Sequence, residues 1–372
     1  MGEMKFTPEQ EAAIGHRGGA LLVSAAAGSG KTKVLVERLL SRVQEGSDID
    51  EFLVITYTRA SASELRERIL EEISERQALE PDNRRLRRQS MLCRRAPIDT
   101  IHGFCTGILR ENAHSAGLPP DFRVLDESES AIIKAEVLED VLDSVYETIG
   151  ESHEFRALVD TMSAGRDDAR LISIVLDAHG KLQSNPNPRE WVQGQIRALS
   201  LPGVRDISET AWGEALLGKN RRMAIYWLNE MKRVREAAEA YPDFEAAYGA
   251  SLDATISDIA DFLSALALGW EEARGFSEIG FPRAKGVKGH DGLKSARTRC
   301  RAAMKKSAEG FLCTSDEHIE DMRAAAPAMT ALLRLILDFD RAYSEEKRRR
   351  GLADFSDLEH LTLSLLIDGA TG

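Results

Sequence analysis

The sequence predicts an α/β fold in which a phosphate-binding loop belongs to a parallel sheet and a large, mainly helical segment is inserted. In the first 115 residues, short apolar segments rich in β-branched residues alternate with helical periodicity. A glycine-rich loop joins the first of these segments to a helix. From about residue 126 to 345 helical periodicity dominates. Together these three observations favour an α/β core interrupted by a helical insertion.

The N-terminal elements follow the order of a parallel sheet. Residues 20–24 are predicted as a short buried strand, and residues 32–44 as a helix. The run "EFLVITYT" (51–58) predicts a second strand, and "SASELRERILEEISERQ" (61–77) predicts a helix with apolar residues four positions apart. "APIDTIHGFCTGIL" (96–109) predicts another short element that leads into a helix. This alternation is typical of parallel strands with helical connections.

The pattern changes after "SAGLPPDF" (115–122), where the helical insertion is expected to begin. Proline and glycine interrupt it at residues 183–190, 201–203 and 278–292. All four tryptophans lie in this part, and we expect them to anchor its core (Trp191, Trp212, Trp227 and Trp270). A helix at 329–346 and the stretch "ADFSDLEHLTLSLL" (353–366) are expected to rejoin the α/β core.

The glycine-rich loop carries the chemistry of a nucleotide-binding P-loop. The pattern G-x-x-x-x-G-K-[ST] begins here with an alanine and continues with small residues, followed by a second lysine (Ala25, Ala26, Ala27, Gly28, Ser29, Gly30, Lys31, Thr32 and Lys33). Small residues let successive backbone N–H groups converge on phosphate oxygens, and the following helix adds its positive end. Lys31 is expected to neutralise the β- and γ-phosphates of ATP, and the Thr32 hydroxyl to bind Mg²⁺. These two are the candidate catalytic residues.

The stretch "FTPEQEAAI" (6–14) before the loop has two interpretations. Thr7, Pro8 and Gln10 form the pattern of a capping box at a helix start. The amide of Gln10 also offers both a donor and an acceptor, so this side chain could read the edge of an adenine.

Two further stretches suit a nucleic-acid strand. In "TYTRASASELRER" (56–68), Tyr57 suits base stacking, and Thr58 and Arg59 suit phosphate contacts. An ordinary strand end followed by a helix N-cap accounts for this pattern equally well. "TIHGFC" (100–105) adds His102 and Phe104 as an expected exposed polar-aromatic pair, which is a weak signal alone.

In combination, these motifs resemble the UvrD/Rep-type superfamily 1 DNA helicases. The resemblance rests on the order and spacing of Q-x-x-A, A-G-S-G-K-T, V-I-T-Y-T-R-A-x-A-x-E-L-R-E-R and T-I-H-G-F-C. Within these helicases, residues 98–130 are most similar to the AddA type, the helicase-nuclease subunit of bacterial AddAB complexes. Both ends of the chain resemble the family strongly and residues 150–330 only loosely. The resemblance implies a RecA-like core, ATP and Mg²⁺ as cofactors, and a motor on single-stranded DNA that processes double-strand breaks with an AddB-type partner subunit.

The resemblance also implies residue roles. The residue matching Gln10 contacts adenine, and those matching Gly28 to Thr32 hold phosphates and Mg²⁺. Five matching residues lie along the DNA strand (Tyr57, Thr58, Arg59, His102 and Phe104). Arg59 departs from the family pattern, because an asparagine is commoner at its position.

The family comparison sets expected domain boundaries. Residues 1–115 are expected to form the first part of the RecA-like domain 1A, residues 116–328 the helical domain 1B, and residues 329–372 the return to 1A, ending before the Walker B strand. Two stretches imitate the acid site of that strand, V-L-D-E (124–127) and L-I-L-D (335–338). The first follows too short an apolar run, and the second has helical spacing. We therefore expect the chain to bind ATP weakly and to hydrolyse it negligibly.

The net charge of −12 argues against a purely basic nucleic-acid binder. Two basic runs nevertheless occur within this acidic chain. Residues 84–95 hold six arginines and no acid, and residues 283–306 hold nine lysines and arginines beside Asp291 alone. We expect both runs to face DNA, and the second to hold duplex. The four cysteines form no paired framework, and no secretory or membrane-spanning segment is visible, so a bacterial cytoplasmic protein without a membrane partner is expected.

Three alternatives remain open at this point. The chain could belong to a repair helicase of the UvrD or RecB type. It could be another P-loop NTPase such as a small-molecule kinase, which would need a second acid site and no DNA motifs. It could also be a binding module with a vestigial P-loop. Coupling between nucleotide and single-stranded DNA affinity separates a motor from a kinase.

Overall fold

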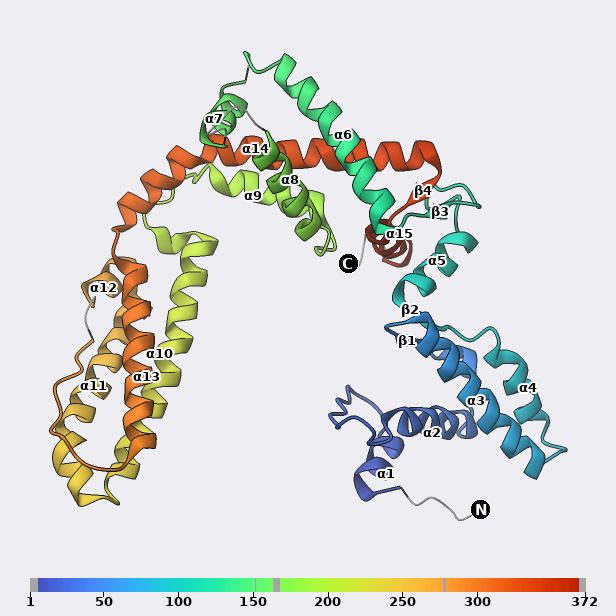
Figure 1. Ribbon diagram of the computed structural model, residues 1–372, viewed down its shortest axis with the longest axis horizontal. Coiled ribbons are helices and arrows are strands. Elements are labelled where there is room, and N and C mark those ends of the chain that lie inside the picture. The colour runs from blue at the N-terminus through green and yellow to red at the C-terminus, as the bar shows by residue number, and fades with distance from the viewer. Residues whose placement is uncertain (1–5, 151, 163–167, 277–278, 368–372) are drawn as a thin grey trace. The chain divides into compact units, whose positions relative to one another are not determined.

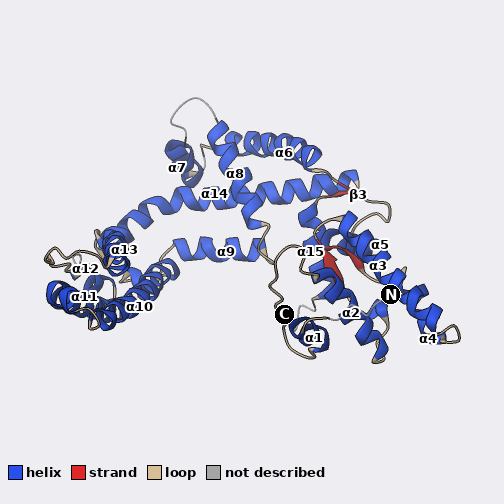
Figure 2. Ribbon diagram, turned by 60° about the horizontal axis from the view of Figure 1, so that its bottom comes forward, coloured by secondary structure: helices blue, strands red, loops and turns tan. Residues whose placement is uncertain are grey.

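The computed structural model describes residues 6–150, 152–162, 168–276 and 279–367, so the outermost residues of the first and last predicted segments lie outside the described ranges. The chain divides into two compact units. Unit 1 comprises Met1–Ala135 and Tyr343–Gly372, and unit 2 comprises Glu136–Ala342 (Figure 1). Helices predominate in both, and the strands, red in Figure 2, are short. None of the helices in the described ranges is long and apolar enough to cross a membrane.

Unit 1 contains all the described strands and follows the predicted alternation. Its elements are α1 (Pro8–Gly15), α2 (Lys31–Gln44), the 3-10 turn η1 (Ile49–Glu51), β1 (Val54–Thr56), α3 (Arg59–Leu79), α4 (Arg84–Cys93), β2 (Ile98–Thr100), α5 (Ile101–Glu111), β3 (Arg123–Val124), the start of α6 (Glu127–Glu147), the end of α14 (Ser315–Arg350), β4 (Leu352–Ala353) and α15 (Phe355–Leu366). β1 pairs in parallel with β2, and β3 with β4. The predicted helix after the P-loop and the parallel strand direction are confirmed.

Among the described residues of unit 1, two apolar clusters pack its elements together. The first lies among α2, α3, α4 and the β1–β2 pair, where Leu40, Ile69 and Ile98 are almost fully buried. Leu65 and Ile73 share the buried face of α3 with Ile69, as their spacing of four residues predicts. The second core joins α5, β4 and α15. Segments from both ends of the chain therefore contribute to unit 1 (Figure 1).

The predicted buried strand at residues 20–24 is wrong for this structure. Residues 20–26 have no regular secondary structure. Leu21, Leu22 and Val23 are 40%, 93% and 45% exposed. A strand is stable only when a neighbouring strand accepts and donates its backbone hydrogen bonds. The described residues pair β1 with β2 and β3 with β4, and they offer no strand to residues 20–24. The apolar composition of residues 20–24 predicted that they are buried, but composition does not show whether a partner strand is present.

The two imitations of an acid site are helix features. Val124 lies in the two-residue strand β3, and the Asp126 carboxylate accepts a hydrogen bond of 2.8 Å from the Glu129 N–H at the start of α6. The V-L-D-E stretch is therefore a strand-to-helix cap. Residues 335–338 lie inside α14, as their helical spacing predicted.

Unit 2 is helical in its described part. It contains the rest of α6, α7 (His153–Met162), α8 (Ala169–Leu182), α9 (Pro188–Leu199), the 3-10 turn η2 (Ile207–Glu209), α10 (Ala211–Ala238), α11 (Pro242–Leu268), α12 (Trp270–Gly275), α13 (Asp291–Ala308), the 3-10 turn η3 (Glu309–Phe311) and most of α14. Proline begins α9 and α11, where its missing N–H costs no hydrogen bond. The predicted helical secondary structure of the inserted segment is confirmed.

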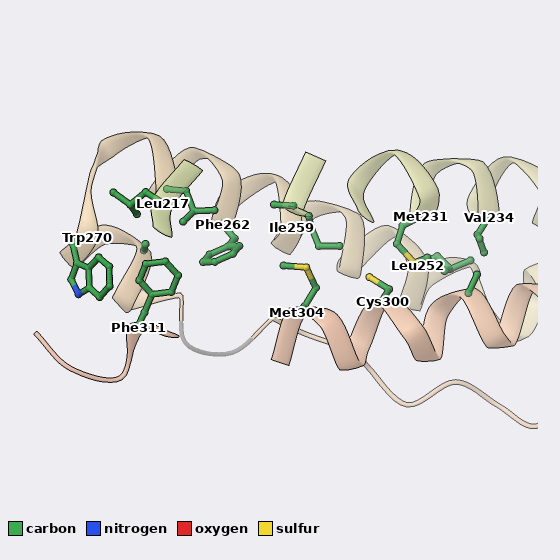
Figure 3. Packing of buried hydrophobic residues seen from close by; sticks show 14 of the residues in the cluster. Leu217, Met231, Val234, Leu252, Ile259, Phe262, Trp270, Cys300, Met304 and Phe311 are labelled. Carbon is green, nitrogen blue, oxygen red and sulfur yellow. The ribbon is translucent and has the colours of Figure 1, made fainter. Parts of the chain in front are cut away.

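The main core of unit 2 lies among α10, α11, α12 and α13. Figure 3 shows Leu217 of α10 near Phe262 of α11, and Met231 of α10 near Leu252 of α11, with Cys300 and Met304 of α13 below. Trp270 is 1% exposed and donates a 3.0 Å hydrogen bond to the Cys313 carbonyl. Trp212 and Trp227 pack at the margin of the same core. The expected anchoring role is confirmed for these three tryptophans and is wrong for Trp191, which is 44% exposed.

Candidate nucleotide-binding and DNA-binding sites

Two glycines give the P-loop its shape. Gly28 and Gly30 have φ angles of 76° and 82°, in the left-handed region that residues with a Cβ rarely adopt. The Ser29 hydroxyl donates a 2.8 Å hydrogen bond back to the Ala26 carbonyl. Gly30 is the N-cap of α2 and provides no side-chain cap, so the first N–H groups of this helix are left for a ligand. Such a helix start favours a phosphate.

The two candidate catalytic side chains lie at the start of α2. Lys31 Nζ donates hydrogen bonds of 2.7 Å to the carbonyls of both Ala25 and Ala26, so its ammonium group lies across the loop. A bound phosphate would compete with these carbonyls for the ammonium. Thr32 is exposed, and its hydroxyl has no hydrogen-bond partner in the described part of the chain. Lys33 Nζ lies 5.4 Å from the centre of the Phe6 ring, on the side of α1.

Gln10 connects α1 to the P-loop. The predicted capping box is confirmed, because Gln10 Oε1 accepts a 2.9 Å hydrogen bond from the Thr7 N–H and Thr7 Oγ1 accepts one from the Gln10 N–H. Gln10 Nε2 donates a 3.1 Å hydrogen bond to the Ser29 carbonyl. The amide thus keeps one further hydrogen and one further lone pair. That pair of groups matches the N7 acceptor and N6 donor of adenine.

The two predicted DNA motifs lie at one edge of the β1–β2 pair. Thr56 at the end of β1 is the register partner of Thr100 at the end of β2. The carboxyl ends of parallel strands meet at the same edge, which is where α/β sheets bind ligands. Tyr57, Thr58 and Arg59 follow Thr56 directly, and His102 follows Thr100 after one residue.

Each of these strands leads into a helix capped by a threonine. Thr58 Oγ1 accepts a hydrogen bond of 3.1 Å from the Ser61 N–H at the start of α3, and it donates to the Ser61 hydroxyl at 2.8 Å. Thr100 Oγ1 accepts 3.1 Å from the Gly103 N–H at the start of α5. The cap interpretation of Thr58 is therefore confirmed. Two positive helix ends face this edge, and Tyr57 is fully exposed beside them.

His102 and Phe104 are half-buried, so the expectation of an exposed pair is wrong. α15 packs against α5, and it brings Glu359 Oε1 to 3.1 Å from His102 Nε2 and the Phe355 ring to 4.6 Å from the imidazole. A Cβ at Gly103 would lie 2.2 Å from Asp99 Oδ1, so any larger residue there would require the Asp99 side chain to move. The imidazole is thus held on one side by α15 and borders the strand edge on the other.

Comparison with known proteins decides the family. Residues 6–371 match the UvrD/REP helicase N-terminal domain. The chain belongs to this family. The match confirms the resemblance to UvrD/Rep-type helicases, and the family implies a RecA-like core.

Relatives of this UvrD/REP-family chain are named as the A subunit of an ATP-dependent helicase/nuclease, which confirms the similarity to the AddA type. The protein of Heliobacterium modesticaldum is 35% identical over 98% of this chain and 28% of its own length. That of Ruminiclostridium cellulolyticum is 34% identical over 99% of this chain and 30% of its own length. That of Desulforudis audaxviator is 36% identical, with 99% and 31% covered. The chain therefore spans less than a third of the length of these relatives.

The first basic run of this UvrD/REP-family chain is only partly free for a ligand. Arg85 donates to the Val43 and Ser47 carbonyls, and Arg88 forms a 2.5 Å ion pair with Asp48. These two arginines fasten α4 to the end of α2. Three others are exposed and form no ion pair within the described residues (Arg84, Arg94 and Arg95).

The second basic run also contains both cations that bind within the protein and exposed cations. Arg297 donates to the Ser251 hydroxyl and the Pro282 carbonyl, and Lys294 donates to the Val287 carbonyl, so both hold the loop before α13. Burial lowers the pKa of the Arg297 guanidinium. The remaining seven are exposed without an ion pair in the described ranges (Arg283, Lys285, Lys288, Arg299, Arg301, Lys305 and Lys306).

Sequence reasoning missed a buried ion cluster beside α15. Lys347 Nζ lies 2.9 Å from Asp354 Oδ2 and 2.6 Å from Asp357 Oδ2, and its side chain is 5% exposed. Burial would raise the pKa of Asp354, but Lys347 and hydrogen bonds lower it below its usual value. Burial, helped by the Asp354 carboxylate, raises the pKa of Asp357. The spacing D-F-S-D signals the observed capping box of α15, whereas nothing local in the sequence points to Lys347 as its partner.

Sequence reasoning also missed Glu359, because 257 positions separate it from His102. A periodic pattern reports contacts within an element or between adjacent elements. It carries no signal for a contact that forms only when α15 packs on α5.

Proposed function

We propose that this chain is the N-terminal ATP- and DNA-binding part of an ATP-dependent DNA helicase/nuclease that processes double-strand breaks. One observation carries the proposal. The Tyr57 and His102 motifs, separated along the sequence, lie at the carboxyl edge of the same parallel strand pair, next to two helix N-termini. An exposed aromatic ring beside positive helix ends suits stacking of bases and binding of phosphates along a single strand.

The P-loop would bind ATP with Mg²⁺. Residues 25–33 would surround the phosphates, with Lys31 as the neutralising cation and Thr32 as the Mg²⁺ ligand. Gln10 would read the adenine edge with the donor and acceptor that its protein contacts leave over. Arg59 and Phe104 complete the proposed DNA-binding set with Tyr57, Thr58 and His102; Thr58 acts there through its helix cap.

We further propose that the RecA-like core is completed by strands that pair with residues 20–24. Leu21, Leu22 and Val23 and the β1 residue Ile55 are exposed, and exposed apolar side chains support the proposal that further strands cover them in the assembled protein. Residues 1–115 and 329–372 would form domain 1A, and residues 116–328 domain 1B. The presence of N-terminal and C-terminal segments in one compact unit supports this division.

The exposed cations of α4 and α13 would face DNA, with those of α13 and its preceding loop on duplex. In support, seven cations of the second run have no ionic partner in the described residues of a chain with net charge −12. The names of the relatives describe one subunit of a larger enzyme, so an AddB-type partner subunit is proposed. Because ATP and chromosomal DNA are its proposed ligands, we place the protein in the bacterial cytoplasm.

The proposal is tested by measuring ATP affinity with and without single-stranded DNA. A motor should show coupling of about fivefold or more, since allosteric coupling is typically 1–3 kcal/mol. Lys31→Ala should abolish ATP binding in both conditions. A small-molecule kinase would bind ATP with the same affinity in the presence of DNA, and this result would reject the helicase assignment.

A further inference from the structure

The short helix α1 is not fixed by a hydrophobic face. It has 8 residues, none of them fully buried. Isolated helices of this length are marginal in water. Yet α1 carries Gln10, whose amide must lie within hydrogen-bond reach of the P-loop for the proposed reading of adenine. Half-buried Ala13 and Ile14 supply only a small apolar contact, so polar contacts are needed in addition to hold the helix in place.

Those contacts are at its C-terminal end. Arg38 of α2 donates from Nη1 to the carbonyls of Ala13 and His16, at 2.6 and 2.7 Å. Arg17 donates from Nη1 to the carbonyls of Ile14 and His16, at 2.6 and 3.0 Å. The last carbonyls of a helix have no partner inside it, so these two guanidinium groups satisfy them.

Both arginines also connect α1 to α2. Arg38 is part of α2 itself, two turns after Lys31. Arg17 donates to the Ser41 hydroxyl at 2.8 Å and forms a 2.5 Å ion pair with Glu45, both at the C-terminal end of α2 or just after it. The same helix that begins at the P-loop therefore fixes the far end of α1, and Figure 1 shows α1 beside α2. At the near end, Gln10 Nε2 reaches the Ser29 carbonyl.

We propose that Arg38, assisted by Arg17, is a positioning residue for base recognition: it holds α1 against α2 so that Gln10 faces the base of a nucleotide bound at the P-loop. This inference rests on the proposed role of Gln10 and extends it to residues that touch neither phosphate nor base. Arg38 acts on the base and not on the phosphates, because its contacts are with α1 and Lys31 makes its own contacts with the loop. Its loss should therefore reduce adenine preference while phosphate binding persists.

The test measures dissociation constants of the full 372-residue chain for ATP, GTP and inorganic tripolyphosphate. Gln10→Ala should lower the preference for ATP over GTP about fivefold to tenfold, the worth of one or two hydrogen bonds to the base. Arg38→Ala should lower it to the same extent and leave tripolyphosphate affinity unchanged. The double variant should be no worse than Gln10→Ala alone, because both changes remove one function.

Two further variants separate positioning from general damage. Arg38→Lys keeps a cation that can reach the two carbonyls and should recover most of the preference. Arg42→Ala removes a partly exposed arginine of the same helix, 3.9 Å from Glu45, and should behave as the unchanged protein. If Arg38→Ala weakens ATP and tripolyphosphate equally, or changes neither while Gln10→Ala lowers the preference, the positioning role is overturned and that of Gln10 stands. If Gln10→Ala itself leaves the preference unchanged, both roles fall.

Discussion

At the scale of single residues, Tyr57 makes the most direct prediction about DNA binding. Its ring is fully exposed at the carboxyl edge of β1. Stacking of a base on an aromatic side chain is worth about 1–3 kcal/mol, so Tyr57→Ala should weaken single-stranded DNA binding roughly 5-fold to 150-fold. Fluorescence anisotropy at fixed salt measures this. Tyr226→Ala, which removes an exposed tyrosine of α10 in unit 2, is the matched control and should leave the affinity unchanged. Equal losses in both variants would reject Tyr57 as a stacking platform.

Lys347 makes a second residue-scale prediction, about stability. Lys347→Met would leave the carboxylates of Asp354 and Asp357 buried without their cation. Breaking a buried pair in this way costs about 3–5 kcal/mol of unfolding free energy, measurable by urea denaturation. Arg348→Met on the same helix removes an exposed cation and should change stability by less than about 0.5 kcal/mol.

The pH dependence of this variant has a definite sign. In the unchanged protein, the lowered pKa of Asp354 means that its stabilisation is present above the unfolded pKa and is lost as pH falls through the folded one. Without Lys347, burial raises both carboxyl pKa values above their unfolded values, so the variant gains stability as pH falls from neutral toward about 4. The difference between the two proteins should therefore shrink in acid. A difference independent of pH would show that charge is not the cause.

At the scale of elements, α13 makes a prediction about duplex DNA. Its buried face carries Cys300 and Met304, while Arg299 and Lys306 lie exposed, one heptad apart on the other side. The double variant Arg299→Glu/Lys306→Glu should weaken duplex binding and reduce the slope of log affinity against log salt by about 0.9 for each phosphate that the protein no longer neutralises. Arg170→Glu/Arg197→Glu makes the same charge change on α8 and α9 and should preserve the slope. Identical slopes in the two double variants would assign α13 an ordinary solvated surface.

Individual elements also show how much of the fold could be predicted from the sequence. The helices after the P-loop and after β1, and the Thr7 capping box, were predictable because their signals are local: apolar spacing and cap residues. The strand predicted at 20–24 is absent from the structure, because a strand needs a partner and the described residues offer it none. In the site, the P-loop and the strand-edge motifs were visible in sequence. The contacts of His102 with Glu359, and of Arg38 with the end of α1, depend on packing between elements and left no local pattern.

At the scale of the whole molecule, the remaining question is whether this chain can use the ATP that it is proposed to bind. Hydrolysis needs an acid that completes the Mg²⁺ shell and another that positions water. In the described part of the chain, the aspartates at or after strand ends have other partners. Asp99 Oδ1 accepts from the Thr100 N–H, Asp126 caps α6, and Asp354 caps α15 and binds Lys347. None of them is in contact with the P-loop in this structure.

We therefore expect binding without turnover. Phosphate release in the presence of single-stranded DNA should stay below about 0.1 per second, which is about 100-fold below the median kcat of enzymes. Lys31→Ala should remove ATP binding but leave this background unchanged, because the background would not arise at the P-loop. A Mg²⁺-dependent release well above this limit that Lys31→Ala abolishes would contradict the expectation, and it would mean that an acid elsewhere in the chain reaches Thr32 once nucleotide and DNA are bound. Binding that responds to DNA while release stays at background would instead identify the chain as the ligand-binding half of a motor site, whose hydrolytic groups must come from another part of the assembled protein.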